Sequence, residues 1–426
     1  MVEVGYPSAV DSPIPLVIVQ GFLGAGGSFL WGAFEDYLNH NVAPDADGNI
    51  CRRRIIFANV GPVSSLHDRA CELYYELTGG TVDYGEEHAK LYGHQRFGRT
   101  YPTALYPGWS ANKPLHFLGH SMGGPTIVKL QHLLKTGLFG SAATPDMILS
   151  LTSVSAPFRG TQLVYALGER ADAAPAVRTF SIGGALTRVV HVLSYLSPIL
   201  PPALDLHSES RHLSFRDVSI TAFWKQLWKS DWAESRDATP FDVTFQAADE
   251  REANGEGEPN PSTYYRSYVA RLMDAPPQRF SIPSLTGYVM TLSSTAMKSF
   301  KFQSIYPIPH FLRGNGESPP GIPNSPLLPI HGPFLGIPSK TLIENDGVVP
   351  VFSQDHPFEC GAAPCTHSIC PARQKSGIWS VKYLENANHL SIAPIWRGSA
   401  MQIAFWKDVG NWLQDIDHTR EEDDVN

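Results

Sequence analysis

The chain is poor in cysteine. Its 426 residues contain five, at positions 51, 71, 360, 365 and 370. An odd number this small in a long chain excludes a fold held together by disulfides. Cys360, Cys365 and Cys370 lie in a loop rich in glycine and proline, where we expect free thiols or one local bridge because zinc-ribbon spacing is missing. A bound metal is the alternative.

The chain also has no long uninterrupted apolar run. The longest apolar tract, residues 180–206, is broken by Gly183, Gly184, Arg188, Pro198, Pro201 and Pro202, which excludes a membrane-spanning helix there. Residues 1–15 lack a basic start followed by an apolar run, so no secretory signal is evident. We expect either an intracellular protein or a numbering that begins at a mature secreted form.

An excess of positive charge is missing as well. The 33 basic and 41 acidic residues give a net charge of −8, which argues against nucleic acid as a partner and disfavours steady adhesion to an anionic membrane. The hydrophobic share of 42% is ordinary for a globular protein. The length suits one large catalytic domain with insertions, or two domains, and we expect a single domain over residues 1–426.

One stretch combines a short apolar strand with a Gly-x-Ser-x-Gly turn. Residues 115–124 read Leu-His-Phe-Leu-Gly-His-Ser-Met-Gly-Gly, and a helical pattern follows from 122 to 134. A serine between Gly119 and Gly123 at such a turn is typical of the nucleophile elbow of an α/β-hydrolase. The helix behind it directs N–H groups at an incoming oxyanion, so Ser121 is the candidate nucleophile of acyl transfer, most often ester hydrolysis.

Strand and helix patterns alternate along the chain. The strands are expected at 16–20, 55–60, 149–154, 264–269 and 378–384, and helices at 68–77, 122–134 and 399–413. This alternation predicts an α/β-hydrolase fold with a mostly parallel central sheet and helices on both faces. We expect a loop at 314–338 and a frayed polar tail at 421–426.

The middle of the chain, about residues 160–260, interrupts this alternation. It is helical and rich in aromatic residues, and apolar side chains recur at helical spacing at Leu186, Val189, Val190, Leu193 and Leu196. A core helix and a mobile lid over the active site both fit this pattern. The flanking glycines and prolines and the position after the elbow favour the lid as much as the spacing favours a core helix.

A serine nucleophile needs a histidine base and a carboxylate that orients it. On this fold the order is serine, aspartate, histidine, and Asp346 and His389 follow Ser121 in that order, each in a loop at the correct sheet edge. For the oxyanion hole we expect the N–H groups of Met122 and of Phe22, the latter in the loop after the first strand. An ordinary glycine turn is the alternative for that loop.

A second group contains Asp68, His88, His94 and Asp237. Histidine and carboxylate ligands in a tetrahedral set suit structural zinc. From spacing alone this group carries little weight, because two histidines six residues apart match no standard zinc pattern.

Several longer motifs resemble the thermophilic bacterial lipases of the Geobacillus type, which are related to staphylococcal lipases. They read Asn-Val-Gly-Pro-Val-Ser-Ser at 59–65, Gly-His-Gln-Arg-Phe-Gly-Arg-Thr-Tyr-Pro at 93–102, Ser-Ala-Pro-Phe-Arg-Gly-Thr at 155–161, Asn-Pro-Ser-Thr-Tyr-Tyr at 260–265, Glu-Asn-Asp-Gly at 344–347 and Asn-His-Leu at 388–390. The resemblance runs from about residue 14 to 412. It implies lipase or esterase activity, a helical lid that opens at an interface, and structural zinc held by Asp68, His88, His94 and Asp237.

Two departures from the family pattern stand out, and Asp231 and Asp242 lie close enough to compete with Asp237 as a zinc ligand. Gln20 occupies the place of the family's histidine before Gly-Phe in the oxyanion loop. The family's calcium site uses a glutamate two positions beyond the catalytic histidine. This chain has Ser391 there, which puts calcium binding in doubt.

The sequence thus predicts a lipase-like serine carboxylester hydrolase that acts on acylglycerols or other esters through an acyl-enzyme. The alternatives are an acyltransferase or thioesterase on the same fold, or a non-catalytic lipid-binding protein. Lipid or ester substrate, at a lipid–water interface where the lid opens, is the expected partner.

Overall fold

The structure is a computed structural model, and it describes residues 13–22, 24, 31–42, 51–201, 204–272, 282–310, 342–367 and 375–425. The loop expected at 314–338 and Cys370 lie outside these residues. No helix among them is long and apolar enough to cross a membrane.

The centre of the molecule is a seven-stranded sheet of order β2-β1-β5-β6-β7-β9-β8. All its neighbouring strands pair in parallel. The strands are β1 (Leu16–Val19), β2 (Ile55–Ala58), β5 (Leu115–His120), β6 (Ile148–Val154), β7 (Tyr264–Arg271), β8 (Cys365–Thr366) and β9 (Trp379–Glu385). The central strands β1, β5 and β6 are buried along their whole length, as continuous apolar runs in a covered parallel sheet should be.

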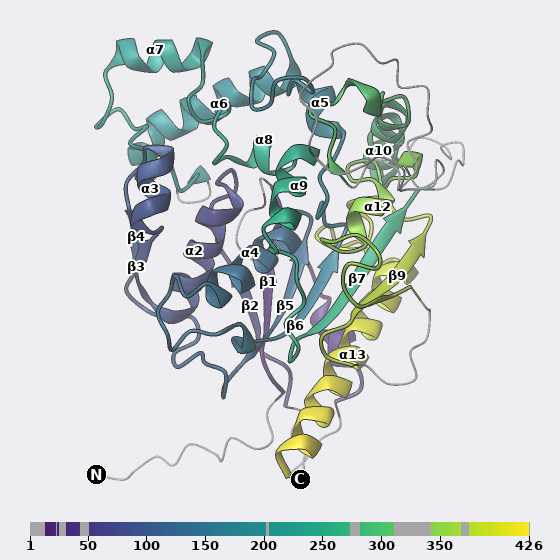
Figure 1. The fold of residues 1–426 in the computed structure, drawn as a ribbon. Coiled ribbons are helices and arrows are strands. Elements are labelled where there is room, and N and C mark those ends of the chain that lie inside the picture. Colours follow the sequence, from purple (N-terminus) through teal and green to yellow (C-terminus); the bar gives the residue numbers. More distant parts are fainter. Residues whose placement is uncertain are drawn as a thin grey trace, which may run out of the picture.

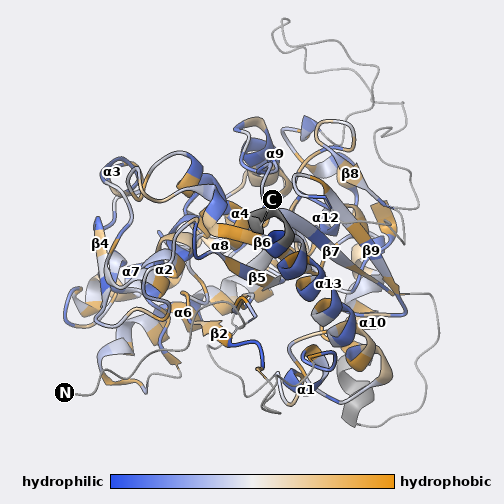
Figure 2. Cartoon of the chain, turned by 90° about the horizontal axis from the view of Figure 1, so that it is seen from below, coloured by the Kyte–Doolittle hydropathy of each residue, from blue (hydrophilic) through white to orange (hydrophobic). Residues whose placement is uncertain are grey.

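Helices cover both faces of this sheet (Figure 1). On one face, α2 (Leu66–Thr78) and α4 (Gly123–Lys135) pack against the core that contains Val17 and Val19. On the other, α1 (Glu35–Leu38) and α13 (Ala400–Val425) pack against Leu16 and Ile18. Successive residues of β1 thus alternate between the two cores. Figure 2, from below, shows β5 and β6 between α4 and α13.

The helical insert and two later helices lie at the end of the sheet toward which the arrows of β7 and β9 point in Figure 1, the carboxyl ends of the strands. The insert at 160–260 contributes α5 (Leu163–Leu167), α6 (Ile182–Leu196), α7 (Ile220–Trp228), α8 (Thr239–Asp242) and α9 (Phe245–Ala253). Further along the chain come α10 (Ile282–Lys298) and α12 (Val351–Gln354). Ligands of open parallel sheets bind at this edge.

A small hairpin subdomain lies beside α2. Strands β3 (Gly80–Asp83) and β4 (Phe97–Tyr101) form a separate antiparallel sheet, and α3 (Glu86–Tyr92) connects them. Arg99 of β4 reaches Asp205 of the insert at 3.0 Å. The hairpin therefore joins the sheet domain to the helical insert.

The α/β-hydrolase fold and the mostly parallel sheet predicted from the sequence are confirmed. One local prediction is wrong: the polar tail at 421–426 is not frayed, because α13 continues to Val425. The helix continues past the expected end at 413 because Ile416 is buried in the core and Asp417 pairs with Arg53.

Candidate active site and metal centre

Ser121 lies in the sharp turn between β5 and α4. Its φ of 54° is in the left-handed region, which a non-glycine residue rarely adopts. A Cβ on Gly119 would lie 2.4 Å from the backbone of Gly123, and one on Gly123 would lie 2.0 Å from the carbonyl oxygen of Val19. Only glycine fits at both positions, so the strand and the helix can close tightly around the serine.

Asp346 and His389 form a buried pair. The Nδ1–H of His389 donates to Oδ2 of Asp346 at 2.9 Å. The other carboxylate oxygen, Oδ1, accepts the N–H groups of Val348 at 2.8 Å and of Val349 at 2.7 Å. Asp346 is fully buried and His389 is 6% exposed. These contacts fix the imidazole with Nδ1 protonated, which leaves Nε2 as the basic nitrogen.

The histidine segment lies directly beside the elbow. His120, the residue before Ser121, donates from Nε2 to the carbonyl oxygen of His389 at 2.9 Å. Burial, with the His389 ring nearby, lowers the pKa of His120 to about 3, so its ring is a neutral donor. Val348 and Val349, next to Asp346, line the same pocket as Ser121. The structure therefore brings the three predicted triad residues to one edge of the sheet.

The predicted oxyanion loop lies against the serine. Phe22 and Met122 line the pocket together with Ser121, and a Cβ on Gly21 would lie 2.7 Å from that of the serine. The guanidinium of buried Arg69 donates to the carbonyl oxygen of Gln20. This bond supports the loop from behind, where this chain departs from the family's histidine.

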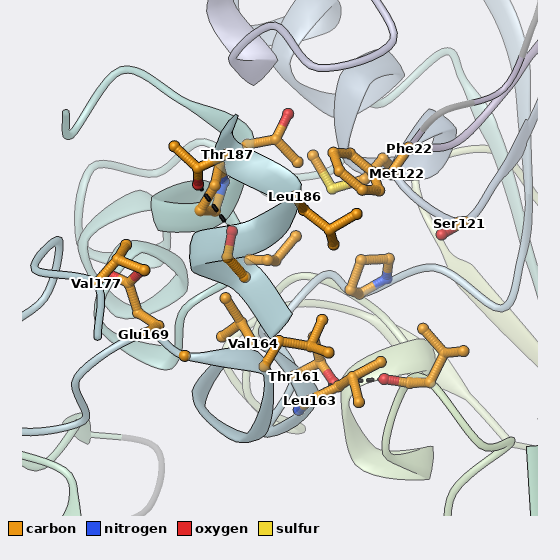
Figure 3. A pocket seen from close by; sticks show the side chains of 18 of the residues that line it. Phe22, Ser121, Met122, Thr161, Leu163, Val164, Glu169, Val177, Leu186 and Thr187 are labelled. Carbon is orange, nitrogen blue, oxygen red and sulfur yellow. Dashed lines mark hydrogen bonds between the residues drawn. The ribbon is translucent and has the colours of Figure 1, made fainter. Parts of the chain in front are cut away.

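The pocket in front of Ser121 is a largely apolar cavity of about 160 Å³. Leu163 and Val164 of α5 line one side, and Leu186 and Val190 of α6 line another. Figure 3 shows Leu186 pointing from α6 toward Phe22 and Met122. A cavity of this kind suits an acyl chain.

Glu169 is the one ionisable side chain among the described residues that line this cavity. It is 2% exposed, and neither carboxyl oxygen has a hydrogen-bond partner within the part of the chain that the structure describes. Burial, reinforced by Glu234, raises the pKa of Glu169 to about 8. The carboxyl group is therefore neutral at pH 7, and the cavity stays uncharged.

Helix α6 has apolar side chains on two sides. Its inner side reaches the cavity, whereas Val189 is 53% and Val192 is 39% exposed. On the neighbouring α7, Trp224 is 58% and Trp228 is 70% exposed. Helix α6 is therefore not fully buried, and its exposed outer side is apolar rather than polar.

Asp68, His88, His94 and Asp237 converge between α2, α3 and the insert. One ligand atom from each lies within 4.8 Å of the others. Nε2 of His88 is 3.5 Å from Oδ1 of Asp68 and 3.3 Å from Oδ1 of Asp237. Nε2 of His94 is 3.4 Å from Oδ2 of Asp237. Tetrahedral zinc with bonds of about 2.1 Å separates its ligands by about 3.4 Å, so the set fits the ion.

The surroundings of this cluster agree with a cation at its centre. Oδ1 of Asp68 and Nε2 of both histidines are buried and have no hydrogen-bond partner among the described residues. Arg211 donates to the other carboxylate oxygen of Asp68, Oδ2, at 3.2 Å. It also donates to Oδ2 of Asp237 at 2.5 Å. Asp242, one of the two alternatives to Asp237 as a metal ligand, instead accepts the N–H of Leu66.

Three features of the sites escaped the sequence reasoning. Glu169 follows the apolar run 163–167, and an isolated acid there was the available signal. Arg211 gave no signal. His356 and His367 flank Cys360 and Cys365, and this His-x3-Cys-x4-Cys-x-His spacing is visible once ribbon spacing is not required.

The fold and the strained serine turn together define an α/β-hydrolase. The profile of the family described as lipase-like, C-terminal domain, matches residues 12–296. The chain belongs to this family, and the resemblance to staphylococcal lipases expected from the motifs is confirmed.

Two curated relatives are lipases of staphylococci. The chain is 31% identical to the lipase of Staphylococcus hyicus over 293 residues, which is 62% of this chain and 42% of that protein. It is 26% identical to lipase 2 of Staphylococcus aureus over 388 residues, or 86% of this chain and 48% of that protein. The chain thus spans less than half the length of these relatives.

Solved structures show the same fold. The crystal structure of the S. hyicus lipase matches with a TM-score of 0.67 at 23% identity, over 98% of this chain and 100% of that chain. EstA from Clostridium botulinum matches with a TM-score of 0.60 at 26% identity, over 96% of this chain and 89% of that chain.

Proposed function

We propose that the chain is a lipase-like serine carboxylester hydrolase that works through an acyl-enzyme. One observation carries the proposal: Ser121, held at positive φ in the elbow, faces an apolar cavity beside the Asp346–His389 pair. The elbow places the Ser121 hydroxyl at the sheet edge in front of the cavity, as nucleophilic attack requires. The lipase and esterase names of the relatives support the same class.

In the proposed reaction, Nε2 of His389 takes the proton of the Ser121 hydroxyl while its oxygen attacks the ester carbonyl carbon. The N–H groups of Met122 and Phe22 hold the developing oxyanion. His389 then gives the proton to the leaving alcohol, and the acyl group remains on Ser121. A water molecule, deprotonated by the same nitrogen, releases the carboxylic acid. Asp346 stays ionised and stabilises the imidazolium throughout.

Substrates with an acyl chain fit the cavity best, because a single neutral carboxyl group interrupts its apolar lining. The exposed apolar side chains of α6 and α7 favour acylglycerols presented at a lipid–water interface. We propose that α6 and α7 act as a lid, in which the outer apolar side binds the lipid surface and movement of Leu186 widens the entrance.

The ion that fits Asp68, His88, His94 and Asp237 is zinc, and we propose a structural role for it. It would join α2 and α3 to the helical insert and supply no chemistry to the ester. Asp68 and Asp237 would hold it with their buried carboxylates, whose two negative charges balance the ion, and the hydrogen bonds of Arg211 would orient both carboxylates.

The test is turnover of p-nitrophenyl esters of graded chain length, above and below the concentration at which they form an interface. Ser121→Ala should lower kcat by about 10⁴-fold or more at every chain length, with an unchanged melting temperature. Ser155→Ala is the matched control, since Ser155 also has a positive φ, of 53°, at a strand end but does not line the cavity. Wild-type turnover in the Ser121 variant would reject the proposal.

An acyltransferase would use the same residues and pass the acyl group to an alcohol, whereas a thioesterase would use them to hydrolyse a thioester. Product analysis in water alone and with added alcohol separates a transferase from a hydrolase, and comparison of ester with thioester substrates identifies a thioesterase. A hydrolase releases free acid in water alone, whereas a transferase needs the alcohol and forms the new ester. A non-catalytic lipid-binding protein would show no turnover in either.

A further inference from the structure

A second group of metal-ligating side chains lies at the far edge of the central sheet. His356, Cys360, Cys365 and His367 each offer one ligand atom, and these four atoms lie within 4.8 Å of one another. His356 follows α12, and Cys365 belongs to the edge strand β8. None of these residues takes part in the proposed ester chemistry.

The distances around Cys360 match those of a tetrahedral zinc site. Its Sγ lies 3.4 Å from Nε2 of His356 and 3.4 Å from Nε2 of His367. It lies 3.8 Å from Sγ of Cys365. Zinc–sulfur bonds of about 2.3 Å and zinc–nitrogen bonds of about 2.1 Å place tetrahedral ligands about 3.8 Å apart for two sulfurs and about 3.6 Å apart for sulfur and nitrogen. A disulfide would require about 2.05 Å between the sulfurs.

Both imidazoles are oriented as metal ligands are. Nδ1 of His356 donates to the carbonyl oxygen of Phe358 at 2.7 Å, and Nδ1 of His367 lies 2.9 Å from the hydroxyl of Tyr383. Nε2 of each ring is directed at Sγ of Cys360, and in His356, whose Nδ1 donates, the lone pair of Nε2 is available. Outer partners of this kind fix the tautomer and the ring plane of metal-bound histidines.

The inner side of the group is anchored in the core. His356 is 2% exposed, and its ring stacks on Phe358 with centroids 4.3 Å apart. Tyr383 belongs to β9, the strand that pairs with β8. The two sulfurs and His367 lie at the surface, so an ion can reach the site without unfolding the chain.

We propose that His356, Cys360, Cys365 and His367 bind a structural zinc ion, separate from the one held by aspartates and histidines. Two thiolates and two imidazoles in a tetrahedral arrangement are a preferred zinc environment, and the two thiolates neutralise the ion. The ion fastens β8 to the connection that follows α12. Since α12 comes directly after the Asp346 loop, the site stabilises the segment that carries the proposed triad aspartate.

The shortness of the edge strand β8, which has two residues, explains why a bound ion would stabilise this region. β8 makes only two paired positions with β9, Cys365 with Trp379 and Thr366 with Ser380. Pairing this short contributes little against the entropy of ordering the 355–367 connection. Metal bonds that link both ends of the connection offset that entropy.

The test uses cobalt substitution, because thiolate-to-cobalt charge-transfer absorption arises only from a cysteine-ligated ion. The full chain is purified without chelator, its metal content is measured, and zinc is then exchanged for Co²⁺. We expect about two zinc equivalents per chain and a strong thiolate band after exchange. The aspartate–histidine centre has no sulfur and cannot give this band.

Cys360→Ser/Cys365→Ser should abolish the band and lower the zinc content to about one equivalent. Cys51→Ser, at an exposed cysteine elsewhere, is the control and should change neither. His367→Gln, at the exposed end of the group, should weaken Co²⁺ binding at least tenfold even if the double cysteine variant fails to fold. A wild-type chain without the thiolate band, or with Cys360 and Cys365 joined in a disulfide in freshly purified protein, would overturn the proposal.

Discussion

Replacing Asp346 by asparagine tests how the imidazole of His389 is oriented. This orientation depends on a contact between two residues far apart in the sequence. Oδ1 of Asp346 accepts two backbone N–H groups, at 2.8 and 2.7 Å, and Oδ2 accepts one, from His389. An asparagine can keep its oxygen on only one side. Keeping it toward the backbone preserves two hydrogen bonds, whereas turning it toward the histidine loses both and opposes two N–H groups with an NH₂ group.

At about 1 kcal/mol for each hydrogen bond, and more for each buried group left without a partner, the asparagine oxygen stays on the backbone side. Its NH₂ group then faces Nδ1 of His389 and forces that nitrogen to accept. The proton moves to Nε2, which can no longer take the proton of Ser121. We expect kcat on a short p-nitrophenyl ester to fall by about 10⁴-fold at pH 7, with little change in the melting temperature.

The matched control is Asp242→Asn. Asp242 is a partly buried aspartate that also accepts a backbone N–H, from Leu66 at 2.7 Å. Burial raises the pKa of Asp242 to about 7, so its carboxyl group is already partly neutral. This variant should keep kcat within about threefold of wild type. A folded Asp346→Asn variant with a similarly small loss would refute the tautomer argument.

Three further predictions concern packing, pH and metal. Gly123→Ala places a Cβ 2.0 Å from the carbonyl oxygen of Val19 and should cost about 3 kcal/mol in urea unfolding, whereas Gly287→Ala, with open space around it, should be neutral or better. The pKa of Glu169 is raised from 4.5 to about 8 in the folded chain, so ionisation of this group destabilises the fold as the pH rises between these two values. Relative to Glu169→Gln, the wild type should lose about 1.4 kcal/mol of unfolding free energy per pH unit in this range and show no difference in pH dependence below pH 4.5. The same free-energy difference between the two chains at pH 5 and at pH 8 would contradict this. Asp68→Asn should lower the melting temperature and the zinc content while leaving kcat on a soluble ester within about threefold; an equal fall in kcat at temperatures where the chain is folded would exclude a purely structural ion.

The sheet and its covering helices were predictable because their signals are local. The apolar run at 16–20 and the alternation of later strands and helices follow from burial on both faces of a parallel sheet. The end of α13 was not, because Val425 is preceded by polar residues whose sequence has no apolar periodicity to mark the helix. The short strands β3 and β4 also carry little apolar alternation, so pairing with each other defines them.

The active site divides in the same way. The turn at Ser121 is encoded by the glycines on either side of it, which is why one motif sufficed to find it. Asp346 and His389 were found only through their order on the fold. Glu169 and Arg211 acquire their roles from contacts between distant segments. His356 and His367 flank the two cysteines within one short segment, but their spacing matches no standard zinc pattern, so only the structure shows that the four side chains converge.

The most direct measurement is covalent labelling with an alkyl organophosphonate, followed by peptide mass spectrometry. A nucleophile activated by His389 should react once per chain, at Ser121, and the rate should fall by about 10³-fold or more in His389→Gln. Ser155, with the same backbone strain, should remain unlabelled. A folded wild-type chain that takes no label at Ser121, or a label that is equally fast without the histidine, would contradict the proposed catalytic serine.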